Sequence, residues 1–178
     1  MQLTKTLITL AMGLTVASAL ALPAADGLEV RADKKGGNNK ANNCANAKKL
    51  AAGIDDNIKI QKQEQSNVAD IEKIVNSNNV DQKKFDAAKK TLLTTIDDGI
   101  KIREANQKLA DGNGAKDGLA TVAKAQAQEK SQAQGLKGTK ADLDTIATMK
   151  KEFAGGIEQN QKNKEAVSSH TLSLTEPH

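Results

Sequence analysis

The amino-acid sequence predicts an all-α protein: an elongated up-and-down bundle of about four helices, with a disordered arm before it and a disordered tail after it. A phrase that occurs as IDDNIKI at residues 54–60 and as IDDGIKI at 96–102, with a weaker echo, AGGIEQNQK, at 154–162, indicates equivalent turns of three helices. In each full copy two isoleucines stand four residues apart, which places them on one helical face. The runs NSNN (76–79) and DGNGAKDG (111–118) are rich in turn-forming residues and separate the periodic segments.

The N-terminus has the three parts of a secretory signal peptide. Lys5 supplies a positive charge, residues 7–20 form an apolar run, and residues 19–21 (ALA) match a small-residue cleavage pattern. We therefore expect residues 1–21 to be removed and the mature chain to be secreted, extracellular and without a membrane span. Cleavage lowers the formal net charge from +4 to +3, and this diluted excess, with only two arginines, argues against nucleic acid as a partner.

Residues 22–43 are rich in Gly, Asn, Lys and Asp and lack periodicity, which is typical of a disordered arm. They are either an uncut arm or a pro-segment cleaved at Arg31 or at the pair Lys34-Lys35. Cys44, the single cysteine, follows directly. In an oxidising compartment it is either an inert thiol or the site of an intermolecular disulfide, which would make a homodimer.

Two long helices are expected next. The first begins at Asn42 or Asn43, either of which can cap it, and ends near Val75. The second runs from about Asp81, which lies near the positive end of the helix dipole, to Ala110. The predicted inner stripe of the first helix comprises Ala47, Leu50, Ile54, Ile58, Gln61, Gln65, Val68, Ile71 and Val75; that of the second comprises Phe85, Ala88, Leu92, Ile96 and Gly99.

The third helix is expected to be short, at about residues 119–134, with a thin apolar stripe. Thr139, with Asp142 three residues later, forms a near capping box that opens the fourth helix, which we expect to end near Val167. The bundle domain is therefore predicted at residues 44–167. The polar residues 168–178 are predicted to be a disordered tail.

The repeated acidic pairs, Asp55-Asp56 and Asp97-Asp98, are the main candidates for chemistry. If the first two helices pack side by side, these carboxylates can meet and bind a cation or act as an acid and a base. Adjacent helical residues point about 100° apart, however, so surface carboxylates balanced by the following lysines are the stronger interpretation. The histidines His170 and His178 lack further ligands. No nucleophile elbow, phosphate loop or metal motif is present, and we predict no enzyme activity, catalytic residue, metal or cofactor.

Amide side chains fall on the predicted inner stripes at Gln61, Gln65, Gln126 and Gln161. Buried amides must find partners, so they form either a polar seam that fixes the register of the helices or an opening for a polar ligand. The alternative is that the helices are simply exposed there.

The segments IDDNIKIQK, IDDGIKIRE, GLATVAKAQAQE, GLKGT and DLDTIATMKKEFAGGIEQNQKN, following Cys44, resemble a family of small secreted proteins of filamentous ascomycete fungi that includes many effector candidates. The resemblance covers about residues 44–163. It implies an extracellular helical protein without catalytic residues that acts at a host or surface interface. The chain is more loosely similar to fungal hydrophobic-surface-binding proteins.

We therefore expect a secreted, non-catalytic interaction protein, a candidate effector or elicitor, that binds an unknown protein or cell-surface partner through a helical surface. The alternative is a structural protein associated with the cell wall or with hydrophobic surfaces. The residues expected to pack the repeats together are Ile54, Ile58, Ile96, Ile100 and Ile157.

Overall fold

The computed structural model describes the backbone of residues 37–175 and the side chains of residues 42–169. Within this part of the chain lie α1 (Gly37–Asn76), α2 (Gln82–Leu109), α3 (Lys116–Gly135), a 3-10 turn η1 (Lys140–Asp142) and α4 (Leu143–Thr175). The all-α bundle of four helices is confirmed. The predicted signal peptide and most of the predicted arm or pro-segment fall outside the described residues.

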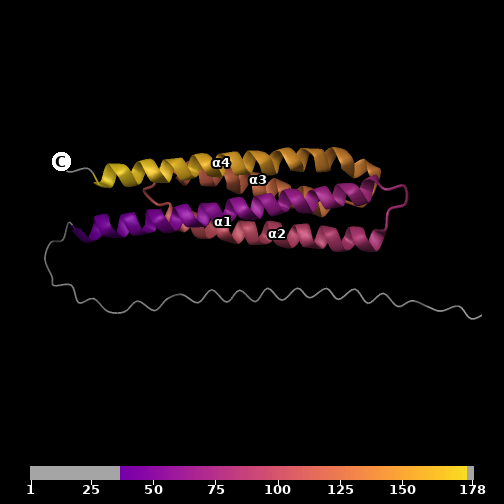
Figure 1. Ribbon diagram of the computed structural model, residues 1–178, viewed down its shortest axis with the longest axis horizontal. Helices are drawn as coiled ribbons and strands as arrows, with labels where there is room; N and C mark the ends of the chain where they lie inside the picture. Colours follow the sequence, from indigo (N-terminus) through magenta and orange to yellow (C-terminus); the bar gives the residue numbers. More distant parts are fainter. Residues whose placement is uncertain (1–36, 176–178) are drawn as a thin grey trace, which may run out of the picture. The chain divides into compact units, whose positions relative to one another are not determined.

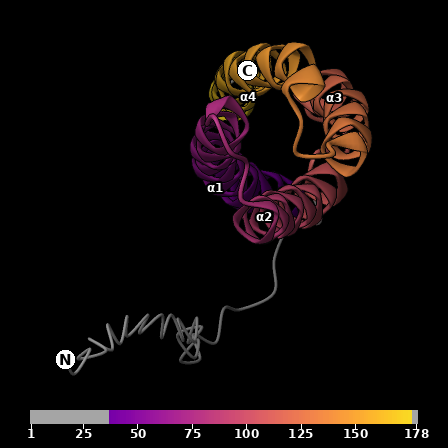
Figure 2. The ribbon, with the colours of Figure 1, turned by 90° about the vertical axis from the view of Figure 1, so that its right-hand side faces the viewer.

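The four helices form a ring in which each packs against two neighbours. α1 contacts α2 and α4, and α3 contacts the same two helices, so α1 and α3 face each other across the bundle axis (Figure 2). Short connections join successive helices, which run side by side along their length in opposite directions (Figure 1). At about 1.5 Å per residue, the 40 residues of α1 extend about 60 Å, which makes the bundle elongated.

Buried positions alternate by three and four residues along the helices. On α1 they are Ala47, Leu50, Ile54, Asn57, Gln61, Glu64, Val68, Ile71 and Val75. A mean spacing of 3.5 residues is the heptad pattern of coiled coils, in which side chains of one helix insert between those of its neighbours. The same alternation runs from Asp142, at the end of η1, through α4 to Val167.

Two apolar clusters occupy the two ends of the bundle. The larger comprises Val68, Ile71, Val75, Phe85, Leu92, Ile96, Ala133, Leu136, Ile146, Met149 and Phe153. The smaller comprises Ala47, Leu50, Ile54, Ala110, Ala115, Leu119 and Val167. The larger cluster holds both phenylalanines of the chain, so most of the hydrophobic stabilisation lies at that end.

The predicted starts of the second and fourth helices carry side-chain caps, whereas Asn42 and Asn43, predicted to cap the first helix, lie inside α1. The Asp81 side chain caps α2 by accepting a hydrogen bond from the N–H of Lys84. Asp142 accepts the N–H groups of Lys137, Gly138 and Thr139 through one carboxylate oxygen, at 2.7–3.0 Å. This carboxylate therefore holds the turn between α3 and α4, where Gly138 has a φ of 76°.

Three helices extend beyond the ends predicted for them. α1 begins at Gly37, inside the predicted arm at residues 22–43, because adding a residue to an existing helix gains a hydrogen bond without a new nucleation step. α4 continues to Thr175, into the predicted tail at residues 168–178, because no glycine or proline interrupts the chain before Pro177. α3 likewise begins at Lys116.

Candidate functional site

The middle of the bundle is polar. Between the two apolar clusters, every buried position on α1, α2 and α4 is a polar residue or a glycine, and on α3 Val122 is the one buried apolar residue. We call this set the polar layer; it comprises Asn57, Gln61, Glu64, Gly99, Arg103, Asn106, Gln126, Glu129, Gly156, Asn160 and Asn163. Because water cannot reach these groups, each must find its partner inside the protein or remain costly to bury.

The two copies of the repeated phrase contact each other in the polar layer. Asn57 and Gly99 occupy the same place in the two copies, and the Asn57 amide donates to the Gly99 carbonyl at 2.8 Å. Asn160 on α4 donates to the side-chain oxygens of Asn57 and Gln61 at 2.8 and 2.9 Å. This network joins α1, α2 and α4, and its geometry holds only in one register.

Glycines make room for the polar side chains. A Cβ atom at Gly156 would overlap the amide nitrogen of Gln61, and one at Gly99 would stand 3.0 Å from Glu64 Oε1 and 3.2 Å from Gln126 Nε2. Gly53 and Gly118 face asparagine side chains of a neighbouring helix in the same way. These four helical glycines therefore leave space for buried polar side chains of neighbouring helices.

Arg103 is the buried cation of the polar layer, with 8% of its surface exposed. Its Nε donates to Gln126 on α3 at 3.0 Å, and a terminal nitrogen donates to Gln107 on its own helix at 2.7 Å. The other terminal nitrogen lies 3.6 Å from Glu104. The guanidinium thus links α2 to α3.

Glu64 on α1 and Glu129 on α3 are completely buried. None of their four carboxyl oxygens has a hydrogen-bond donor in the part of the chain that the structure describes. Burial, and then the negative charge of Glu129, raise the pKa of Glu64 to about 8. Burial, and then the charge of Glu152 on α4, raise the pKa of Glu129 to about 8. Both carboxyls are therefore mainly protonated at neutral pH.

The acidic pairs do not converge on a common site. Asp56 and Asp98 each pair with the lysine three residues later, Lys59 and Lys101, at 2.8 Å on the outside of the helix. Asp55 instead reaches Lys164 on α4 at 2.7 Å. Asp97 reaches Lys130 on α3, also at 2.7 Å. The carboxylates are thus balanced by lysines, as the stronger interpretation of the sequence predicted.

The residues predicted to pack the repeats divide into two groups. Ile54 and Ile96 are completely buried. Ile58, Ile100 and Ile157 are only half-buried, and the neighbouring heptad positions point inward instead. Ile58 packs against the smaller apolar cluster and Ile100 against the larger one, while Asn57, Gly99 and Gly156 are buried.

Among the predicted inner amides, Gln61 and Gln126 are buried, whereas Gln65 is half-buried and Gln161 is exposed. Cys44 lies half-buried in α1 with a free thiol, and a homodimer through it stays a prediction. The side chains of His170 and His178 fall outside the described residues.

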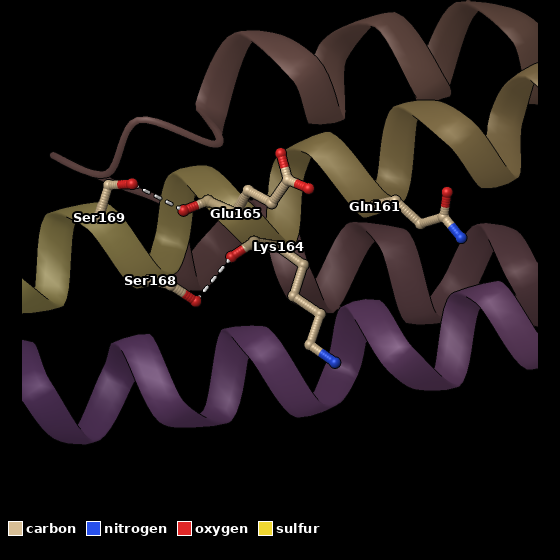
Figure 3. A pocket seen from close by; sticks show the side chains of 5 residues that line it. All are labelled: Gln161, Lys164, Glu165, Ser168 and Ser169. Carbon is tan, nitrogen blue, oxygen red and sulfur yellow. Dashed lines mark hydrogen bonds between the residues drawn. The ribbon is translucent and has the colours of Figure 1, made fainter.

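A hollow of about 520 Å³ lies on the outer side of α4, lined by Gln161, Lys164, Glu165, Ser168 and Ser169 (Figure 3). Both serine hydroxyls donate to carbonyls of their own helix at 3.1 Å. Lys164 extends toward α1, whereas Glu165 points away from it. The polar ends of Gln161 and Glu165 are exposed and make no hydrogen bond or ion pair to the described part of the protein.

Among the described residues, no group of three or more His, Cys, Asp and Glu side chains could hold a metal ion. No helix in the part of the chain that the structure describes is long and apolar enough to cross a membrane. Comparison with protein-family models, curated proteins and solved structures gave no match.

Proposed function

We propose that the protein is a secreted, non-catalytic interaction protein that binds a protein partner through the outer faces of its helices. The observation that carries this proposal is the hollow on α4, where Gln161 and Glu165 are free to contact a partner. An exposed amide beside an exposed carboxylate suits a partner surface that offers hydrogen-bond donors and positive charge.

The arrangement of the acidic pairs supports a non-catalytic role. Catalysis by two carboxylates needs them to face one bound substrate, and the aspartates are distributed over separate lysine partners. The polar layer supports binding by a rigid surface, because its cross-helix hydrogen bonds hold the outer faces in one arrangement.

The test compares retention of partners from culture fluid and host extracts on three immobilised proteins. These are the wild type, a Gln161→Arg and Glu165→Arg double variant, and a control with arginine at Thr94 and Ala105, exposed residues of α2. We expect one partner to be retained by the wild type and the control and lost by the α4 variant. Equal retention on all three would reject the α4 face, and an unresponsive host after infiltration of the wild type would reject the effector role.

A second candidate function is association with an anionic wall or surface, and the lysines near the start of α2 favour it. Lys89 donates to the carbonyls of Gln134 and Leu136 at 2.7 Å, which brings the exposed lysines Lys90 and Lys137 to the same end of the bundle. Retention on isolated cell walls that weakens between about 50 and 500 mM salt would support it, because screening removes attraction between exposed charges. Full recovery in the supernatant at low salt would reject it.

A further inference from the structure

We propose that Glu64 and Glu129 form a proton switch in the polar layer: protonated carboxyls keep the middle of the bundle closed, and their ionisation in alkaline solution loosens α3. This inference is independent of the proposed binding function. It rests on the placement of the two carboxyls, on the side chains around them and on the way α3 is held.

The two carboxyls lie inside the polar layer. Glu64 and Glu129 come from α1 and α3, which face each other across the bundle axis (Figure 2). A Cβ atom at Gly99 would stand 3.0 Å from Glu64 Oε1 and 3.2 Å from Gln126 Nε2, and Gln126 is one helical turn from Glu129. Both carboxyls therefore occupy the dry centre of the bundle, where two negative charges would repel each other strongly.

α2 and α4 contribute the neighbouring charged side chains. α2 contributes Arg103, but its guanidinium is engaged by Gln126, Gln107 and Glu104. α4 contributes a further carboxyl, Glu152, which accepts hydrogen bonds from Gln128 and Gln132 on α3. Arg103, the cation of the layer, thus makes no hydrogen bond or ion pair with Glu64 or Glu129.

Protonation changes both the charge and the hydrogen bonding of the two carboxyls. The four oxygens of Glu64 and Glu129 have no hydrogen-bond donor among the described residues. A protonated carboxyl has an O–H that can donate to a neighbouring oxygen, so protonation removes the charge and supplies missing donors together. Ionisation removes both contributions.

α3 is the element that loosens. It is the shortest of the four helices, with 20 residues. Over the three turns between Val122 and Ala133 its fully buried positions are Gln126 and Glu129. No fully buried apolar side chain holds this stretch, so its attachment depends on hydrogen bonds of the layer.

The direction of the pH dependence follows from linkage. Both carboxyls have a pKa of about 8 in the folded protein, raised from an ordinary value of 4.5. The folded state then binds more protons than the unfolded state between these values, so the contribution of the two carboxyls to stability is fully present below about pH 4.5 and is lost as the pH rises to about 8. Each carboxyl contributes up to about a tenfold loss in the folding equilibrium constant per pH unit in this window.

The test is urea unfolding at several pH values, followed by circular dichroism because the chain has no Trp or Tyr. The proteins are the wild type, Glu64→Gln, Glu129→Gln, the double variant, and Glu158→Gln on the exposed side of α4 as a control. We expect the wild type and the control to lose stability steeply between about pH 5 and 8, each single variant to lose about half of that slope, and the double variant to lose most of it. Equal slopes in the wild type and the double variant would overturn the proposal.

Two measurements on the wild type keep the test independent of how the variants fold. Carbon-13 NMR titration of the glutamate carboxyls should find two that ionise near pH 8; ordinary values for all of them would overturn the proposal. Hydrogen exchange, corrected for its intrinsic pH dependence, should find amides of α3 between residues 122 and 133 losing protection first. Recovery of alkaline stability on adding Ca²⁺ or Mn²⁺, absent in the double variant, would replace the proton switch by a cation site.

Discussion

The larger apolar cluster and the polar layer are built on the same helices with the same heptad spacing, yet they stabilise the bundle in different ways. In the apolar cluster, Phe85 and Phe153 pack with aliphatic neighbours, and burial does not depend on charge. In the polar layer, amides and carboxyls contribute only if every partner is in place. The comparison teaches that one end supplies most of the stability, whereas the middle selects one register and makes it sensitive to pH.

The largest effect is expected at the apolar end. Phe153→Ala removes a fully buried ring and should lower the free energy of unfolding by about 3–5 kcal/mol. Because no ionisable group takes part in this packing, the loss should be the same at about pH 5 and pH 8, measured by urea unfolding. A loss that depends on pH would break the separation between the two regions.

The next effect tests which face of α1 is inside. Ile54→Ala, at a completely buried position, should cost about 2–5 kcal/mol. Ile58→Ala, four residues on in the same phrase, should cost less than about half as much, since Ile58 is half-buried. Equal losses of unfolding free energy in the two variants, measured by thermal or urea unfolding, would mean that Ile58 contributes as much to the core as Ile54.

Local features of the fold could be predicted from the sequence better than the residues that face the bundle axis. Helical spacing, the loops and the caps at Asp81 and Asp142 were predictable, because they depend on local hydrogen bonds and turn-forming residues. The polar layer was only partly predictable: Gln61, Gly99 and Gln126 were expected inside, but hydrophobicity favoured Ile58 over Asn57. Spacings of three and four residues from Ile54 fit the helix equally well.

Choosing between them requires the partner helices. Asn57 is tolerated inside because the Gly99 carbonyl and the Asn160 amide satisfy it, and no sequence window contains all three. The burial of Glu64 and Glu129 was not predicted for the same reason. One signal was present: Gly99 stands in the middle of a long helix at the position that Asn57 occupies in the first copy, and a helical glycine often marks a close approach.

A smaller effect separates the polar layer from the surface within one helix. Gly156→Ala places a methyl group against the Gln61 side chain, which also accepts from Asn160 at 2.9 Å. We expect a loss of about 1–2 kcal/mol, since overpacking outweighs the better helix propensity of alanine. Gly155→Ala is the matched control, because its methyl would meet nothing within 4 Å, and it should gain about 0.5–1 kcal/mol. Opposite signs in urea unfolding would sharpen the boundary of the layer, whereas a gain in both would show that Gln61 moves aside freely.

The smallest effect concerns polar contacts outside the layer. Lys164 reaches both carboxylate oxygens of Asp55 at 2.7 Å, but the two side chains are 45% and 43% exposed, so solvent screens the pair. A double-mutant cycle with Lys164→Met and Asp55→Asn should give a coupling of about 0.2–1 kcal/mol that shrinks in about 0.5 M salt. The pair of Lys130 with Asp97 has similar exposure and should behave alike. A larger, salt-independent coupling would mean that these outer pairs also fix the register, a role that the comparison otherwise reserves for the buried amides of the polar layer.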